Sequence, residues 1–369
     1  VVGGYMSKFV YIFSFAVIPL YGYTLHEIAT GGYPLSMFDG KNVGLGYTSI
    51  VVTDADNPAC YDSISAVVIN LQLHQITEER KVKVYNEFED YVGEATRAIR
   101  DELHTVPMPL GINLYKHGVS FDFKVSPKYV FDYEFKLPMY DDYYLIRGWQ
   151  IESSTGMVIS YSTMLGVRVW PTLYVGVGGS YLKGDWQHAK MWRPSYEGSE
   201  PWDTSISGKL QGINFTFGIC IKPSFRWTIG GIWKISTLKD TLFDYPQSTY
   251  GVGIGYRPAN ILPAYFVAEV LTHQGKHREW EYHMGVEHEL MPSFLLRAGF
   301  AWLSAAKDER LSKGIYTAGI GYSSAFCEID IGISFWCRKY SAYLVDVEGF
   351  DKIDESMFSV IFTIKKELP

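Results

Sequence analysis

The chain has 369 residues, a formal net charge of −7 and a sequence pI near 5.8, values that argue against a nucleic-acid partner. Only 20% of the residues are charged, whereas Gly (35), Tyr (28), Phe (21) and Trp (10) are abundant, which suits an all-β protein that keeps apolar surface. The four cysteines, Cys60, Cys220, Cys327 and Cys337, show no CxxC spacing. The sequence therefore indicates neither a zinc site nor a disulfide framework.

The N-terminal stretch has the pattern of a secretory signal. Lys8 precedes the apolar run FVYIFSFAVIPLYGY, which begins at Phe9. This run is shorter than the roughly 20 residues of a membrane-spanning helix and has the length of a signal-peptide core. We therefore expect residues 1–21 to be a signal peptide, with VVGGY before Met6 as upstream read-through. The alternative is a buried N-terminal strand.

An alternation of period two dominates the chain after residue 61 and is typical of β-strands. In the stretch GINFTFGICI the apolar positions are Ile213, Phe215, Phe217, Ile219 and Ile221. The stretches FRWTIGGIWKI, from Phe225, and YGVGIGYR, from Tyr250, alternate in the same way. In the last of these, three glycines occupy the other face. Each such stretch predicts a strand with one apolar face.

Short and long connections alternate along the chain. Tight turns are expected at 126–128, 170–172, 222–224, 257–260, 291–293 and 323–324. Longer loops are expected at 75–106, 138–156, 185–207, 237–247, 274–279, 305–313 and 338–354. Six turns and seven loops predict fourteen strands between about residue 62 and about residue 365.

An even number of strands with short turns on one side and long loops on the other is typical of an outer-membrane barrel. Lipid offers no hydrogen bonds, so strands in it must close without a free edge. We predict an all-β fold, a 14-stranded antiparallel transmembrane β-barrel over residues 62–369. The alternative is a secreted β-sandwich, whose outer faces would be far more polar. Pairing Leu290 with Phe294 at one turn would place Glu287 opposite Arg297 on the inner face.

Residues 77–104 interrupt the alternation with helical spacing. The apolar positions are Val84, Phe88, Tyr91, Val92, Ala95, Ile99 and Leu103, and charged residues fill the other face. The order of turns and loops assigns this segment to the first outside loop. We therefore expect a helical first extracellular loop.

Candidate chemical sites are few. His273, His277, His283 and His288 cluster around one hairpin beside Glu279 and Glu281. This spacing on two strands has no established metal geometry, so solvated histidines are favoured over a metal site. The pairs Asp141–Asp142 and Asp54–Asp56 have no histidine nearby, and no GxSxG motif occurs. We predict no enzyme activity, no metal and no cofactor.

Glycines at alternate inward positions thin the wall of the predicted barrel, which leaves room for a ligand or for an internal segment. The inward charged residues are candidate lumen ligands: Arg168, Arg226, Lys234, Arg257, Arg297 and Glu287. The cations would meet the carboxylate of an amphiphile. The alternative is that they neutralise lumen acids such as Glu287, Glu328 and Asp330.

Two stretches before the first strand carry a resemblance to a known family. GYTLHEIATGGYPL, from Gly22, and GLGYTSIVVTDADNPACY, from Gly44, are similar to the N-terminal plug of FadL-type outer-membrane transporters. The shared features are a glycine-rich segment, an acidic stretch and an Asn-Pro-Ala motif just before strand one. GINFTFGICIKPSFRWTIGGIWK and YHMGVEHELMPSFLLRAGFAW also resemble hairpins of that family. The predicted fourteen strands equal the family's number.

The resemblance implies a plug over residues 22–61 inside the lumen, with the motif Asp54, Asp56, Asn57, Pro58 and Ala59. Asn57 and Pro58 would fix a turn, with the Asn side chain bonding local backbone, and the two aspartates would hold the plug to the lumen wall.

The implied function is passive, plug-gated uptake of hydrophobic or amphiphilic small molecules, such as long-chain fatty acids or aromatic hydrocarbons. The implied place is the outer membrane of a Gram-negative-type bacterium, with outer-membrane lipid and the barrel-assembly machinery as partners. Apolar residues of the outside loops would capture the solute first: Phe88, Tyr91, Val92, Ile99, Trp186 and Trp192. The alternative is a non-transporting barrel that acts as an anchor or a secretion-system partner.

Overall fold

The computed structural model describes most of the chain after residue 38. The described residues are 33–34, 39–53, 56–61, 64–106, 109–140, 145–195, 200–239, 245–258, 263–275, 278–305, 311–324, 326–345, 347 and 349–368. The predicted signal peptide at 1–21, the beginning of the predicted plug and Asp54 lie outside them. No helix in the described ranges is long and apolar enough to cross a membrane.

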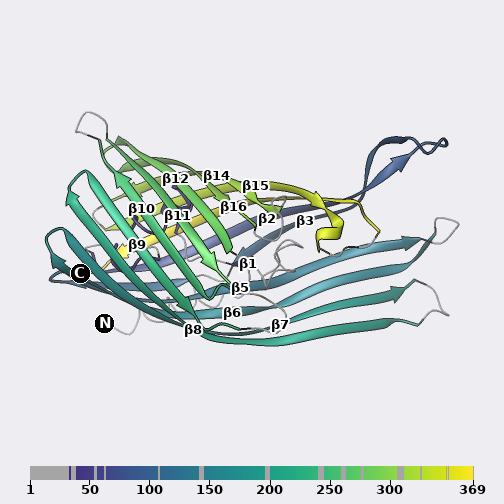
Figure 1. Cartoon of the computed structure of the whole chain (residues 1–369), viewed down its shortest axis with the longest axis horizontal. Coiled ribbons are helices and arrows are strands. Elements are labelled where there is room, and N and C mark those ends of the chain that lie inside the picture. The colour runs from purple at the N-terminus through teal and green to yellow at the C-terminus, as the bar shows by residue number, and fades with distance from the viewer. Residues whose placement is uncertain are drawn as a thin grey trace, which may run out of the picture.

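Nearly all of the regular structure is β-strand (Figure 1). The elements are β1 (Tyr33–Pro34), α3 (Gly40–Gly44), β2 (Ala66–Tyr85), β3 (Tyr91–Val106), β4 (Leu110–Lys116), β5 (Val119–Tyr140), β6 (Ile146–Trp170), β7 (Leu173–Pro194), β8 (Trp202–Ser224), β9 (Trp227–Ser236), β10 (Ser248–Tyr256), β11 (Ala264–Gln274), β12 (Arg278–Met291), β13 (Phe294–Leu303), β14 (Lys313–Ser323), β15 (Cys327–Ser341), η2 (Ala342–Val345) and β16 (Lys352–Glu367).

The strands form one antiparallel sheet that closes on itself. Neighbours in sequence pair around the sheet from β4 to β16, β16 pairs with β2, and β2 pairs with β4. Of the sixteen strands in the sheet, β1 and β3 lie off this ring, so fourteen strands close the barrel. The predicted fold class and strand number are therefore confirmed.

The alternation seen in the sequence separates an apolar outer face from an inner face. On β8 the outward side chains of the GINFTFGICI stretch are between 37% and 47% exposed, whereas Cys220 between them is fully buried. Trp227, Ile229 and Trp233 on β9 are exposed in the same way. So much apolar surface is unfavourable in water, at about 25 cal/mol per Å², but suits a lipid-facing belt.

The prediction of a helical first loop is wrong, because residues 77–104 continue the sheet. β2 and β3 pair from Gln72–Val106 to Tyr85–Tyr91. Asn86 shapes the turn between them by accepting hydrogen bonds from the backbone N–H groups of Phe88 and Asp90, both at 2.9 Å. An amphipathic helix forms in a protein when its apolar face packs on a core. Here Phe88 is 75% exposed, so no such core covers it.

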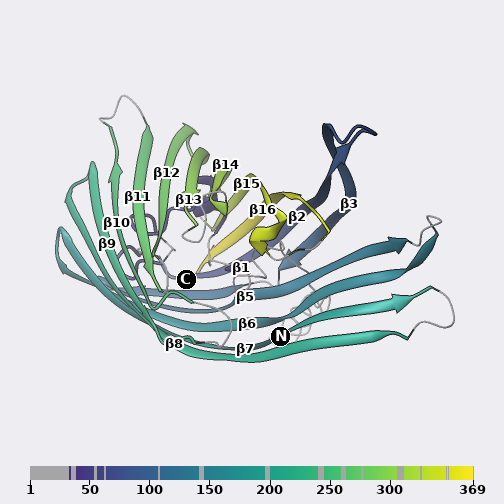
Figure 2. The same cartoon turned by 45° about the vertical axis from the view of Figure 1, so that its right-hand side comes forward.

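The first short turn is also displaced from its predicted place. Residues 126–128 lie inside β5, where the pairing with β6 shifts register between Pro127 and Tyr129. The chain instead reverses at His117–Gly118, and both residues have positive φ (50° and 83°). The predicted loops 138–156 and 185–207 are mostly strand, since β5 to β8 continue beyond the ends of β9 to β14 (Figure 2).

Among the described strands, the wall is interrupted along a seam between β3 and β5. β4 pairs with β5 only from Leu110–Val125 to Lys116–Val119, and in the described part of the chain β3 pairs with β2 alone. Pro109 stands at the break and cannot donate to a ladder. The two residues of β1 pair with Tyr129 and Val130 of β5 on this free edge.

Candidate functional site in the barrel interior

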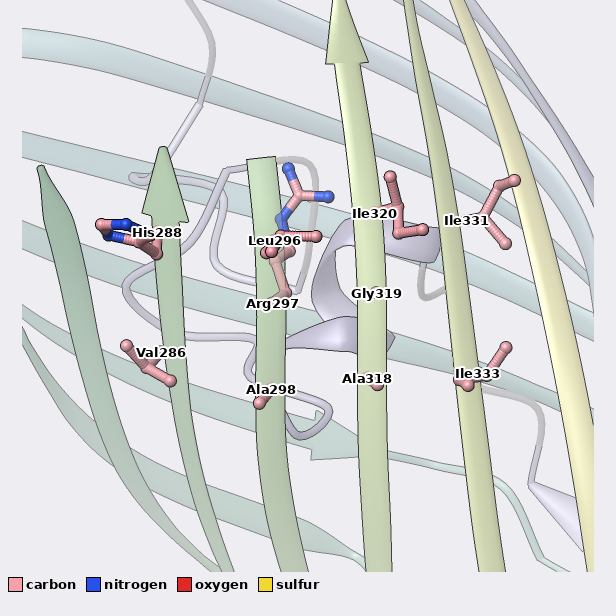
Figure 3. Close-up of a pocket in the computed structure, with 10 residues that line it drawn as sticks. All are labelled: Val286, His288, Leu296, Arg297, Ala298, Ala318, Gly319, Ile320, Ile331 and Ile333. Carbon is pink, nitrogen blue, oxygen red and sulfur yellow. The ribbon is translucent and has the colours of Figure 1, made fainter. Parts of the chain in front are cut away.

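The barrel interior holds a segment of chain that precedes the first barrel strand. This inner segment, residues 39–53 and 56–61, begins with Asp39, which caps α3 by accepting the Asn42 N–H at 2.8 Å. α3 lies against β13 to β16, and Figure 3 shows it behind β13 and β14. Further along, Ile50 and Val51 reach β9 and β10, and Tyr61 reaches β6.

Inward glycines of the wall provide the space for the inner segment. The glycine belt consists of Gly166, Gly176, Gly218, Gly230, Gly253, Gly285, Gly299, Gly319 and Gly332. Several of them face each other across neighbouring strands, as in Gly285–Gly299 and Gly166–Gly176. A Cβ on Gly299 would lie 2.2 Å from the Gly46 nitrogen, so a side chain there has no room. Along this belt the inward glycines leave the space that residues of the inner segment occupy.

Glu269 on β11 takes the place of a glycine in the belt, since it pairs with both Gly253 and His283. Its carboxylate accepts the backbone N–H of Ser49 at 2.6 Å, of Ile50 at 2.8 Å and of Val51 at 2.9 Å. Hydrogen bonds to an ionised acceptor are about twice as strong as neutral ones. The sequence analysis missed this residue, although a lone acid at an inward strand position, between Ala268 and Val270, was a visible signal.

The Asn-Pro-Ala motif lies on β7 and β8. The Asn57 side-chain amide donates to the Ile50 carbonyl at 2.7 Å and to the Ile219 carbonyl at 3.2 Å, and its Oδ1 accepts the Ala59 N–H at 3.0 Å. A Cβ on Gly176 would lie 2.4 Å from the Pro58 carbonyl carbon. Asn57 therefore shapes the local turn, as predicted, and also binds the wall.

Asp56 forms an ion pair with Lys234 of β9, with 2.5 Å between Oδ2 and Nζ. Burial alone would raise the pKa of Asp56, but the ammonium groups of Lys234, Lys128 and Lys124 lower it below 3.8. The carboxylate is therefore ionised at neutral pH. Asp56 contacts the lumen wall as expected, whereas Asp54 lies outside the described residues.

We expect Asp56→Asn to loosen residues 56–61 by about 1 kcal/mol, because the variant loses a partly buried ion pair, and to speed their backbone hydrogen exchange about fivefold. The folded pKa is lowered, so the stabilisation is complete above 3.8 and disappears as pH falls through the folded value. Mass spectrometry at pH 6 should separate variant from parent, and the difference should shrink as the pH falls below 3.8. Asp185→Asn, at an exposed position on β7, is the control.

The predicted pairing of Glu287 with Arg297 is confirmed, although Met291 rather than Leu290 stands opposite Phe294 because of a bulge. Arg297 Nε donates to Glu287 Oε2 at 2.8 Å, and Nη1 contacts Asp330 of β15. The Arg297 side chain is completely buried. Arg297 is thus held between two carboxylates beneath α3. This arrangement matches the alternative in which the lumen cations neutralise lumen acids and do not bind a ligand.

The other predicted lumen cations lie apart from one another. Arg168 is exposed at the end of β6, and Arg257 is exposed beside the Tyr265 ring, 4.4 Å from its centroid. The prediction that Arg226 faces the lumen is wrong, because β9 begins only at Trp227 and Arg226 lies in the turn before it. Of the predicted lumen cations, all within the described residues, only Lys234 and Arg297 form ion pairs in the interior.

The histidine cluster divides between the two faces of the wall. His273 and His283 each lie 3.1 Å from a different oxygen of Glu281, and His283 Nδ1 donates to the Gly46 carbonyl at 2.8 Å. The prediction of a solvated histidine is wrong for His283, which is 3% exposed. His277 lies outside the described residues. No metal-binding group of three His, Cys, Asp or Glu occurs in the described ranges.

The predicted capture residues have different surroundings. Phe88, Tyr91, Val92 and Ile99 are exposed on the β2–β3 hairpin. Trp186 is not in an outside loop, because β7 carries it to the inner face, where it stacks on Phe131 with ring centroids 6.0 Å apart. It belongs to a buried cluster on the inner face of the wall, here called the upper inner cluster: Phe131, Val158, Leu182, Trp186, Leu210, Leu238 and Tyr245. Trp192 is half-buried near Gly148.

A depression of about 500 Å³ occurs on the outer face, over β12 to β15 (Figure 3). Val286, Leu296, Ile320 and Ile331 surround it, and the small residues Ala298, Ala318 and Gly319 form its floor. Its lining is apolar. It is therefore part of the lipid-facing belt and is separate from the interior.

The sequence matches no protein-family model and no curated protein. Solved structures match throughout the barrel. The chain is similar to a Pseudomonas aeruginosa FadL homologue with a TM-score of 0.60 and 11% identity, over 91% of this chain and all of that one. It is similar to the Ralstonia pickettii toluene transporter TbuX with a TM-score of 0.63 and 11% identity, over 91% and 99%.

The Pseudomonas putida toluene transporter TodX is similar with a TM-score of 0.59 and 11% identity, over 91% of this chain and 99% of that one. The chain has the FadL-type fold. Within this FadL-type barrel, the inner segment, the glycine belt and the β3–β5 seam are the features that distinguish the interior from that of an open pore.

Proposed function

We propose that this protein is an outer-membrane channel of a Gram-negative bacterium for passive uptake of hydrophobic or amphiphilic small molecules. Residues 22–61 would act as its plug and residues 62–369 as its barrel. The structures of similar fold are named as a FadL homologue and as toluene transporters. A wide aqueous pore serves apolar solutes poorly, because their surface stays in water along the whole path.

The observation that carries the proposal is the unpaired seam between β3 and β5. The seam begins where β4 ends, and the 7 residues of β4 separate it from the turn at His117–Gly118. Seven residues span about 23 Å along a tilted strand, which would place the seam within the apolar layer of a membrane. Arg100 bounds the seam above, with its guanidinium 4.6 Å from the centre of the Tyr133 ring. A solute inside the barrel would leave sideways into lipid through this seam.

Apolar residues line the proposed exit and the space above it. Val106 of β3 and Val130 of β5 belong to one buried cluster, and Phe131 belongs to the upper inner cluster with Trp186. β1 pairs with β5 at Tyr129 and Val130, so it covers part of the seam. Displacement of β1 together with the inner segment would open the path, while Glu269 and Arg297 hold the resting position.

Uptake of labelled toluene or fatty acid by cells that lack their own hydrophobic-compound channels tests the function. Expression of this chain should raise uptake several-fold, and Val106→Trp, which fills the seam, should remove most of the gain. Val84→Trp, exposed on the β2–β3 hairpin, is the matched control. Heat-modifiable migration on a gel would verify folding of both variants.

Two results would contradict the proposal at different levels. If the unsubstituted chain failed to raise uptake, it would not be a transporter, and the anchor or secretion-partner role would be favoured. If uptake rose but Val106→Trp left it unchanged, transport would stand and the exit between β3 and β5 would be wrong.

A further inference from the structure

Two cysteines that are far apart in sequence meet at the end of the inner segment. Cys60 follows the Asn-Pro-Ala motif, and Cys220 faces inward on β8. Both are free and buried, with 3% and 0% of their surface exposed. They pack in one buried cluster with Ala59.

The surrounding backbone fixes how the two thiols approach. A Cβ on Gly218 would lie 2.1 Å from Asn57 Oδ1, so the motif rests directly on β8, two residues before Cys220. The Asn57 amide bonds the Ile219 carbonyl, and the Cys60 N–H donates to the Asn57 carbonyl at 3.0 Å. Both cysteines are thus attached to the same short network, which holds them in register.

The other two cysteines cannot form such a pair with each other. Cys327 and Cys337 both lie on β15, where ten residues along a strand separate them by about 33 Å. A disulfide requires Cα atoms within about 7 Å. Cys327 and Cys337 therefore serve as internal references for free thiols.

We propose that Cys60 and Cys220 form a disulfide bond that tethers the end of the inner segment to β8. The oxidant is a disulfide, as in thiol–disulfide exchange in the periplasm, a setting that rests on the proposed outer-membrane location. One thiolate attacks the oxidant disulfide, forming a mixed disulfide and releasing one thiol. The second thiolate then attacks the mixed disulfide, which forms Cys60–Cys220 and releases the second thiol. The two cysteines lose two protons and two electrons, and the oxidant gains them.

The bond forms while the barrel assembles. Both thiols are buried once the inner segment is seated, with 3% and 0% of their surface exposed. A disulfide oxidant therefore has no access to them in the folded protein. During assembly both thiols are still in water, and the oxidant reaches them.

The tether would divide the inner segment into a fixed part and a movable part. Residues 56–61 would stay on β7 and β8 whatever the upstream chain does. Only residues 39–53, held by Glu269 and the belt, would be free to rearrange. Passage would thus require a partial movement of the plug rather than its expulsion.

Differential alkylation of protein exported to the outer membrane tests the bond. The protein is unfolded in guanidinium with iodoacetamide, then reduced and treated with N-ethylmaleimide, and its peptides are identified by mass spectrometry. Cys60 and Cys220 should carry the second label, and Cys327 and Cys337 the first. Iodoacetamide on all four cysteines, or a linkage of Cys60 to either β15 cysteine, would overturn the proposal.

Variants separate a covalent tether from simple packing. Cys60→Ser, Cys220→Ser and the double variant should each raise hydrogen exchange at residues 57–61 to the same extent, at least about tenfold. Reductant should reproduce this change in the parent protein and have no effect on the variants, with Cys327→Ser as control. Additive single effects, or no response to reductant, would overturn the tether. These readouts involve no transport, so failure of the uptake assay would leave them intact.

Discussion

Replacing Arg297 with Met is expected to destabilise the barrel by about 3–5 kcal/mol, because Glu287 and Asp330 lose the buried cation between them. The two carboxylates lie beneath α3, where water does not replace the lost partner. Methionine keeps much of the apolar stem, so the lost charge dominates the effect. Denaturant unfolding in detergent micelles, followed by intrinsic fluorescence, measures the change.

Two further variants identify the cause of that loss. Arg226→Met removes a cation from an exposed turn and should change stability by less than about 0.5 kcal/mol. Adding Glu287→Gln and Asp330→Asn to Arg297→Met should recover part of the stability, because neutral partners no longer need the cation. If the triple variant were no more stable than Arg297→Met, lost packing rather than buried charge would be responsible.

Replacing Glu269 with Ala is expected to release the inner segment while leaving the barrel folded. The substitution removes three hydrogen bonds to an ionised acceptor, a loss of about 3 kcal/mol after allowing for solvation. Amides of residues 49–51 should then exchange on the order of 100-fold faster, as measured by mass spectrometry. The global unfolding midpoint should change little, since β11 keeps its ladders to β10 and β12.

The control for Glu269 is Glu289→Gln, at an exposed position of β12 near the turn. Glu269→Gln should be intermediate, because one amide oxygen still accepts a hydrogen bond. If the inner segment is the plug, Glu269→Ala should also raise ion conductance in planar bilayers. Unchanged exchange at residues 49–51 would mean that the glycine belt alone holds the segment.

The sequence alone determined the architecture of the wall. Period-two alternation is a local property, and pairing of every backbone group in lipid turns it into a closed sheet. For this reason the outward Phe215 and Phe217, the inward glycines and the Glu287–Arg297 pair all follow from spacing. The predicted number of strands is correct although one turn is misplaced, because the chain has one turn at His117–Gly118 instead of one at 126–128.

Only the tertiary structure decided which distant residues the closed barrel brings into contact. Residues 77–104 carry both a helical and a strand pattern, and the neighbouring strand provides backbone partners that an exposed helix would lack. Glu269 meets Ser49, and Cys60 meets Cys220, only because the barrel closes around residues 39–61. Such contacts join positions more than 150 residues apart in the sequence, and period-two spacing records only which face a residue occupies.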